Sequence, residues 1–149
     1  MFTPPDPAWE TKVRDSFDRQ GYMRYLDARL MQVEPGLVEI AVAFRPELTQ
    51  QHGFFHAGVS SSIADTAGGY AGFSLFPARS SVLTVEFKIN LLAPARGERF
   101  VFDGRVVKPG RTITVCDGQA FGVAGGQRTL IATMNGTLMA LVDRPGIVE

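Results

Sequence analysis

The chain has 149 residues, of which 45% are hydrophobic and 20% are charged, a composition typical of one globular domain. Fifteen lysines and arginines balance fifteen aspartates and glutamates, so the formal net charge is zero. This balance argues against a nucleic-acid-binding protein with a broad basic surface. It leaves room for a few local cations that meet one phosphorylated ligand.

Cys116 is the only cysteine of the sequence, which excludes an intramolecular disulfide and a zinc site built from cysteines. The first residues lack a basic segment followed by an apolar one, and no run reaches the roughly 18 apolar residues of a membrane span. We therefore expect one domain over residues 1–149, located in the cytoplasm, with residues 1–28 as an N-terminal helical extension.

The predicted elements begin with an amphipathic helix over residues 8–19, which we expect Gly21 to end. Two β-rich runs follow, over residues 30–33 and 37–44. The Glu-Pro-Gly sequence at residues 34–36 between them indicates a hairpin.

Residues 56–76 are rich in small side chains and contain few charges and no proline. We expect a buried central helix here. Each interior glycine costs a helix about 1 kcal/mol relative to alanine, and close approach to a sheet would offset that cost. The alternative is a glycine-rich loop.

Pro77 closes this helix, and the remainder of the chain is rich in β-forming residues. Across residues 83–91 every odd position is apolar and every even position is polar, which predicts a strand with one buried face. Three more strand-rich runs cover residues 99–107, 111–123 and 128–142. This order predicts an α+β fold in which an antiparallel sheet wraps around one helix.

The start of the central helix has no Ser, Thr, Asp or Asn in its capping position, where Phe55 and His56 stand. The first backbone N–H groups of a helix need acceptors, and the positive end of the helix dipole favours a ligand oxygen. The N–H groups of Ala57 and Gly58 are therefore candidate oxyanion donors. Water or a nearby carbonyl is the alternative acceptor.

Asp65 is a lone carboxylate in the middle of this apolar helix, where burial costs free energy unless the group is hydrogen-bonded. It is either a structural group or a catalytic one, acting as a general base for water or as a nucleophile towards an acyl carbon. About 12 Å of helix, at 1.5 Å per residue, separates it from Ala57. One chain can hardly bring both groups to one carbonyl carbon, whereas two antiparallel helices of a two-fold pair can. This predicts an obligate dimer with shared active sites.

Other polar residues near the helix have weaker patterns. His52 and His56 have the i, i+4 spacing of metal ligands, but no third ligand follows at a recognisable spacing, so we expect no metal and a supporting role for His56. Gln50 is placed to hydrogen-bond a carbonyl or a water, and Thr84 to hold Asp65 or a water. Candidate phosphate-binding cations, which solvated strand ends explain equally well, are Lys88, Arg96, Lys108 and Arg111.

In combination these residues resemble the PaaI-like hotdog-fold acyl-CoA thioesterases. The resembling residues are Gln50, His56-Ala57-Gly58, Asp65 and the strand from Thr84 to Ala95. The resemblance covers about residues 30–142. It implies a hotdog fold, a long central helix wrapped by an antiparallel sheet, that forms homodimers and often homotetramers. It also implies hydrolysis of acyl-CoA to the free acid and CoA, with no cofactor.

The resemblance implies a role for each residue. The Ala57 N–H would polarise the thioester carbonyl, and Gln50 of the same chain would help to hold the thioester. Asp65 of the partner chain would activate water or attack directly, with Thr84 nearby to orient it and His56 in support.

The sequence departs from the family pattern at the helix start. His-Gly-Gly is common there, whereas this chain has Ala57 before Gly58, and the added methyl group narrows the approach to the backbone amide. Many relatives have Asn where Gln50 stands. Phe54 and Phe55 replace smaller residues and are expected to wall the acyl pocket. With Gly58 and Arg111 they complete the predicted substrate-binding set.

Two other functions fit parts of the pattern. One is a non-catalytic acyl-CoA-binding hotdog module, which would have no need of a buried carboxylate beside the thioester. The other is a dehydratase or hydratase acting on acyl thioesters, in which His56 and Asp65 would form an acid/base pair. The carrier of the acyl group, CoA or acyl carrier protein, stays open.

Overall fold

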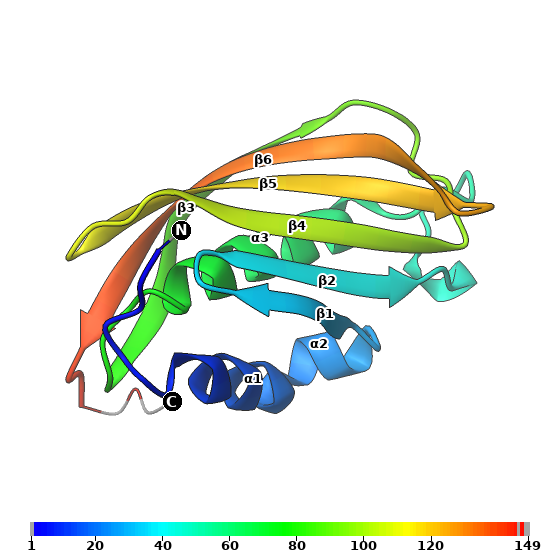
Figure 1. Cartoon of the computed structure of the whole chain (residues 1–149). Helices are drawn as coiled ribbons and strands as arrows, with labels where there is room; N and C mark the ends of the chain where they lie inside the picture. Colours follow the sequence, from blue (N-terminus) through cyan, green and yellow to red (C-terminus); the bar gives the residue numbers. More distant parts are fainter. Residues whose placement is uncertain (1, 146, 148–149) are drawn as a thin grey trace.

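The computed structural model describes residues 2–145 and residue 147. Six strands form one antiparallel sheet in the order β1-β2-β4-β5-β6-β3. The strands are β1 (Arg29–Glu34), β2 (Leu37–Ala43), β3 (Ser80–Leu91), β4 (Arg99–Lys108), β5 (Ile113–Ala124) and β6 (Gln127–Val142). The sheet curves over the long helix α3 (Ala57–Phe73) (Figure 1).

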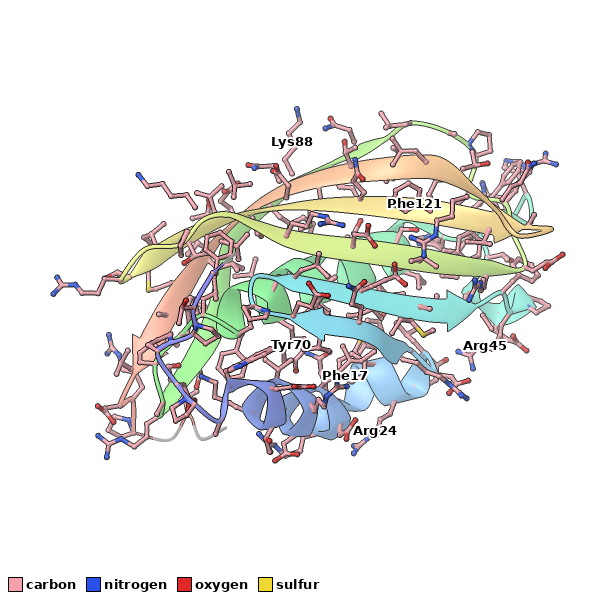
Figure 2. The ribbon with its side chains drawn as sticks, viewed as in Figure 1. Phe17, Arg24, Arg45, Tyr70, Lys88 and Phe121 are labelled. Atoms are coloured by element: carbon pink, nitrogen blue, oxygen red, sulfur yellow. The ribbon has the colours of Figure 1, made fainter. Side chains whose placement is uncertain are left out.

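Two further helices, α1 (Trp9–Arg19) and α2 (Gly21–Tyr25), lie below α3 and the β1–β2 hairpin in Figure 1. A short 3₁₀ helix (Pro46–Leu48) follows β2. The rings of Phe17 on α1 and Tyr70 on α3 meet edge to face with their centroids 5.8 Å apart (Figure 2). The N-terminal segment therefore covers part of α3 that the sheet leaves open.

Close backbone approach explains how a glycine-rich segment forms a stable helix. A Cβ atom at Gly104 of β4 would collide with the backbone of Ala67 on α3. A Cβ atom at Gly68 would lie 2.9 Å from Sγ of Cys116 on β5. Ile63 and Phe73 of the same helix are fully buried, which stabilises the fold by about 1.5–3 kcal/mol for each side chain. The predicted buried helix is confirmed.

The end of α1 differs from the prediction. Gly21 does not end the helix but begins α2, and Gln20 is the residue between the two helices. Gln20 has φ −72° and ψ 102°, an extended conformation that interrupts the helical hydrogen bonds without needing a glycine. The β1–β2 hairpin is as predicted, with Gly36 at φ +79° in its turn.

The prediction of a buried face on the strand at residues 83–91 is wrong for the single chain. The strand forms, as β3, but it is an edge strand of the sheet. Leu83, Val85 and Phe87 have exposed fractions of 48%, 49% and 40%. The alternation correctly indicated a strand, but no other part of the described chain covers these apolar side chains.

The observed architecture is the α+β hotdog fold that the sequence predicts, an antiparallel sheet around a long central helix with an additional N-terminal helix. Across residues 2–145 and 147, no helix combines the length and apolar character needed to span a bilayer.

Candidate active site

The start of α3 is held in place by the loop before it. The Phe55 ring stacks on Phe100 of β4 at a centroid distance of 4.0 Å, and the Phe55 N–H donates to the carbonyl of Ala95 at 3.1 Å. The His56 N–H donates to the carbonyl of Leu48 at 2.8 Å. These contacts fix the position of the first backbone N–H groups of α3.

His56 caps α3 through its side chain, which the sequence analysis did not anticipate. Its Nδ1 accepts a hydrogen bond from the Gly58 N–H at 2.8 Å. A neutral imidazole that accepts at Nδ1 carries its proton on Nε2. The Gly58 N–H is thus already engaged. Within the described part of the chain nothing accepts from the Ala57 N–H, so of the two candidate N–H groups only that of Ala57 is left without an acceptor.

A cavity of about 250 Å³ opens beside this helix start and is mostly apolar. Gln50, Phe54, Phe55 and Ala57 line it, together with side chains of β3, β6 and the loop after β3. The Gln50 Oε1 accepts a hydrogen bond from the His52 N–H, so the NH₂ end of its carboxamide is the part that can donate to a ligand. Two backbone or amide donors therefore border an apolar cavity.

Asp65 lies in a second cavity, of about 210 Å³, between α1, α3 and β3. Thr84 Oγ1 donates a hydrogen bond to Asp65 Oδ1 at 2.8 Å, so the structure brings together the two residues that the sequence paired. Burial raises the pKa of Asp65 above its ordinary value, and the hydrogen bond from Thr84 opposes that rise. A carboxylate with a raised pKa is a better proton acceptor than an exposed one.

The two cavities are separate. Asp65 does not line the cavity at Ala57, and Ala57 does not line the cavity at Asp65. Both residues belong to one continuous helix, so no rearrangement within the described chain brings them to a single carbonyl carbon. One chain therefore holds these two groups in two different cavities.

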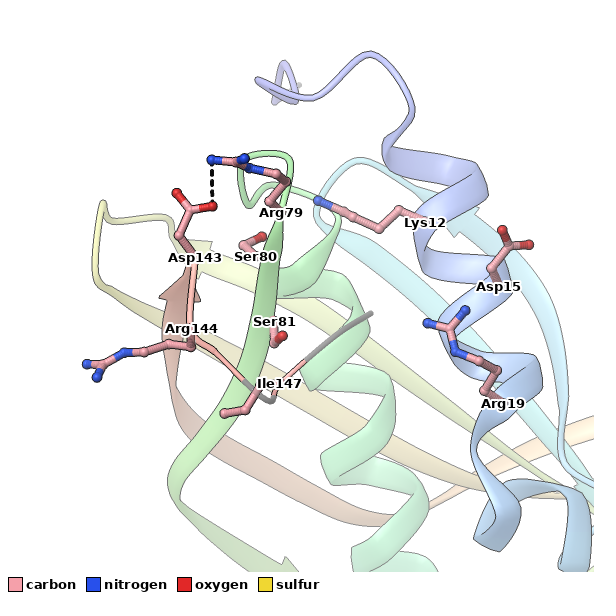
Figure 3. Close-up of a pocket in the computed structure, with 9 residues that line it drawn as sticks. All are labelled: Lys12, Asp15, Arg19, Arg79, Ser80, Ser81, Asp143, Arg144 and Ile147. Atoms are coloured by element: carbon pink, nitrogen blue, oxygen red, sulfur yellow. Dashed lines mark ion pairs between the residues drawn. The ribbon is translucent and has the colours of Figure 1, made fainter.

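A larger cavity, of about 390 Å³, lies at the far end of β3 and contains none of the predicted catalytic residues (Figure 3). Several of its charges are already paired. Arg79 and Asp143 form an ion pair at 2.7 Å, and Lys12 pairs with Asp6 at 3.1 Å. Arg111 lies in the exposed loop between β4 and β5, away from these three cavities.

No group of three His, Cys, Asp or Glu side chains among the described residues is arranged to hold a metal ion. The structure adds two residues that the sequence analysis missed, because Ser16 and Gln20 line the cavity at Asp65. The available signal was their position, since Ser16 and Gln20 continue the inward stripe of α1 that contains Val13 and Phe17.

The described chain thus combines a hotdog fold with an unpaired N–H at the start of its central helix and a half-buried carboxylate eight residues later. Residues 52–127 match the family model of the thioesterase superfamily, and the chain belongs to this superfamily. It is accordingly a thioester hydrolase.

Solved structures of similar proteins have the same fold. A thioesterase family protein from Silicibacter pomeroyi is 53% identical, with a TM-score of 0.89 over 90% of this chain and 98% of that one. The PaaI protein of the Escherichia coli phenylacetic acid degradation operon is 17% identical, with a TM-score of 0.82 over 92% of this chain and 96% of that one, a likeness of fold.

Sequence relatives include SSO2140 of Saccharolobus solfataricus, which is provisionally named an esterase. It is 31% identical over 94 residues, which span 63% of this chain and 66% of that relative's length. A second protein of that organism, SSO1253, carries the same provisional name and is 29% identical over 127 residues, 85% of this chain and 82% of its own length.

Proposed function

We propose that this chain is an acyl-CoA thioesterase whose active sites form between two copies of the chain. The observation that carries the proposal is the placement of Asp65, a half-buried carboxylate held by Thr84 at 2.8 Å, in a cavity separate from the unpaired N–H of Ala57. A hydrolase needs both a base and an oxyanion donor at one carbonyl, and a two-fold pair of antiparallel α3 helices supplies them from different chains.

In the proposed reaction the Ala57 N–H and the Gln50 NH₂ group donate to the thioester oxygen and stabilise the negative charge that develops there. Asp65 of the second copy accepts a proton from water as the water oxygen attacks the acyl carbon. The tetrahedral intermediate then expels the CoA thiolate, which takes up the proton, and leaves the free acid. Direct attack by the Asp65 carboxylate uses the same placement and passes through an acyl-enzyme anhydride that water hydrolyses.

The exposed edge of the sheet supports the proposal that a second copy of the chain binds there. β3 exposes the backbone groups of an edge strand together with Leu83, Val85 and Phe87. An exposed edge strand with a row of apolar side chains is a surface for another chain. Pairing of β3 with its counterpart in a second copy would use these backbone groups, extend the sheet and bring the two α3 helices side by side. A homotetramer would combine two such pairs.

CoA is the proposed carrier on the strength of the family resemblance. The pantetheine arm and the acyl group would occupy the two cavities that meet at the thioester, with Phe54 and Phe55 as walls. Arg111 is the proposed contact for a phosphate of the nucleotide. His56 acts in support, by holding the helix start through Gly58.

Release of free thiol from acetyl-, hexanoyl-, decanoyl-, palmitoyl-, phenylacetyl- and benzoyl-CoA tests the proposal. Wild type should release thiol from at least one of them, and Asp65→Asn should lower kcat by about 10²–10⁴-fold while still binding the substrate. Asp18→Asn, an exposed aspartate on α1, is the matched control and should behave as wild type. Binding without release by the wild type would instead identify an acyl-CoA-binding module.

A further inference from the structure

Ser60, in the first turn of α3, carries a hydroxyl group that the chain itself leaves unused. The residue is 2% exposed and lines the cavity at Ala57. Among the described residues nothing is hydrogen-bonded to its Oγ. Leaving a buried polar group without a partner in the chain costs free energy, so such a group calls for an explanation.

The two serines that follow it on the helix use their hydroxyl groups differently. Ser61 Oγ and Ser62 Oγ each donate to the backbone carbonyl four residues earlier, both at 2.8 Å. This is the local hydrogen bond that a serine inside a helix commonly makes. Ser60 makes no such bond to the carbonyl of His56, which accepts only from backbone N–H groups. The Ser60 hydroxyl is therefore not committed to the helix backbone.

This hydroxyl group is open to the cavity. The buried side-chain polar atoms of the described chain that have neither a partner nor access to solvent are Gln20 Oε1, Arg45 Nε and Asp103 Oδ1. Ser60 Oγ also lacks a partner but is not one of these atoms, so it is within reach of solvent. Because Ser60 lines the cavity at Ala57, that access is through the cavity. A molecule that enters the cavity can therefore bond to the hydroxyl.

We propose, building on the thioesterase function above, that Ser60 is a further catalytic residue. Its hydroxyl donates a hydrogen bond to the thioester oxygen that binds at the Ala57 N–H. This bond strengthens as the oxygen takes up negative charge in the transition state. The proton stays on Ser60 Oγ throughout, so the step needs no base other than Asp65.

The position of Ser60 on the helix supports this assignment. Helical residues three apart share a face, with Cβ atoms about 5–6 Å from each other, so Ser60 stands next to Ala57 along the cavity wall. The Cα–Cβ bonds of a helix tilt towards its N-terminus, which brings the Ser60 hydroxyl closer to the helix start. Among the described residues, Gln50 and Ser60 contribute the polar side chains of this mostly apolar cavity. A donor in such surroundings acts strongly on a developing charge.

Ser60→Ala tests the inference with the acyl-CoA panel given above. We expect kcat to fall by about 10–10²-fold, at or below the usual cost of one lost oxyanion donor. KM should change little, because the lost bond acts mainly in the transition state. The fold loss should be equal for the shortest and the longest acyl-CoA that the wild type hydrolyses, since all of them share the thioester oxygen. Ser62→Ala makes the same replacement where the hydroxyl bonds the backbone, and should keep the wild-type kcat.

Stability separates this catalytic role from a structural one. Ser60→Ala removes a buried hydroxyl that has no partner in the chain and introduces the best helix former. The midpoint of chemical denaturation should therefore stay the same or rise while kcat falls. A lower midpoint together with the lower kcat would make Ser60 a structural residue and overturn the inference. An unchanged kcat, or a loss confined to one length of acyl chain, would overturn it as well.

Failure of this inference is distinguishable from failure of the proposed function. Thiol release that depends on Asp65 but not on Ser60 leaves the thioesterase standing and rejects the role of Ser60. If the wild type releases thiol from no substrate of the panel, the proposed function is rejected, and the catalytic role of Ser60 is rejected with it.

Discussion

The cavity at the start of α3 and the cavity at Asp65 lie along the same helix but are lined by opposite chemistry. Phe54, Phe55 and Leu91 make the first cavity mostly apolar, and no carboxylate lines it. The second contains hydroxyl groups, the carboxylate of Asp65 and the carboxamide of Gln20. Donors act most strongly on a developing charge in apolar surroundings, whereas a buried carboxylate needs polar neighbours to remain ionisable. Keeping the two apart lets each group have the surroundings that it needs.

Mixing two inactive variants of the chain gives the largest expected effect and tests whether the two groups act from different chains. Asp65→Asn lacks the base and Ala57→Pro lacks the helix-start N–H, and each should retain about 1% of wild-type activity or less. In a pair made of one chain of each kind, one site is intact and the other lacks both groups. Random pairing of equal amounts should therefore recover about a quarter of wild-type activity. Thiol release that stays at the average of the two variants would rule out shared sites.

Ala57→Pro alone probes the donor side. Proline is well tolerated at the first position of a helix, and His56 has φ −68° and ψ 135°, the extended conformation favoured before proline. The fold should be kept while kcat falls by about 10²–10³-fold, the usual cost of one lost oxyanion donor. Ala57→Gly keeps the N–H and should keep the activity. A large loss in Ala57→Gly would show that the methyl group or the local turn matters instead.

Thr84→Val probes the carboxylate side through the pH profile. The Thr84 hydroxyl stabilises ionised Asp65, so its removal should raise the pKa of Asp65 further above the ordinary value. A base works only when ionised, and activity is lost as pH falls through its pKa. The acid limb of kcat/KM should therefore move to higher pH, with a loss of about tenfold per unit of pH on that limb and little change on the plateau. Thr84→Ser retains the donor and should leave the limb in place.

His56→Ala should have the smallest effect. It removes the side-chain cap from Gly58 and should lower the free energy of unfolding by about 0.5–1 kcal/mol, as loss of an exposed cap does. His56→Asn restores a capping side chain and should recover most of this stability. Chemical denaturation measures both changes. An unchanged midpoint in His56→Ala would mean that water replaces the imidazole without cost.

Local pattern predicted most of the fold. The alternation at residues 83–91 indicated a strand and the small residues of 56–76 a buried helix, because both are properties of consecutive residues. The covering of β3 was predicted wrongly because the apolar face of an edge strand does not require a cover from the same chain. Gly21 was read as a helix end, whereas an extended backbone at Gln20 is what separates α1 from α2.

Residues of the candidate site could be predicted when their type contrasts with their neighbours in the sequence. They could not be predicted when their role depends on contacts with residues distant in the sequence. Asp65 stands out as a carboxylate among small apolar residues, and Thr84 lies on the polar side of its strand, so their pairing could be expected. The sequence did not predict the side-chain cap by His56, because histidine is not among the usual capping residues. Gln20 was missed because its place on the inward stripe of α1 indicates burial, whereas the cavity that it lines depends on how α1 packs against α3.

Gly104 limits which positions of this enzyme can be varied to change its substrate preference. There is no room for a methyl group between β4 and the backbone of Ala67, so any side chain at position 104 would push α3, with Ala57 and Asp65 on it, away from the sheet. Libraries aimed at new substrates should therefore leave Gly104 and its neighbours on α3 untouched. We expect substitutions to be better tolerated at side chains of the N-terminal segment and of the loop before α3 that line the two cavities, such as Ser16 and Phe54.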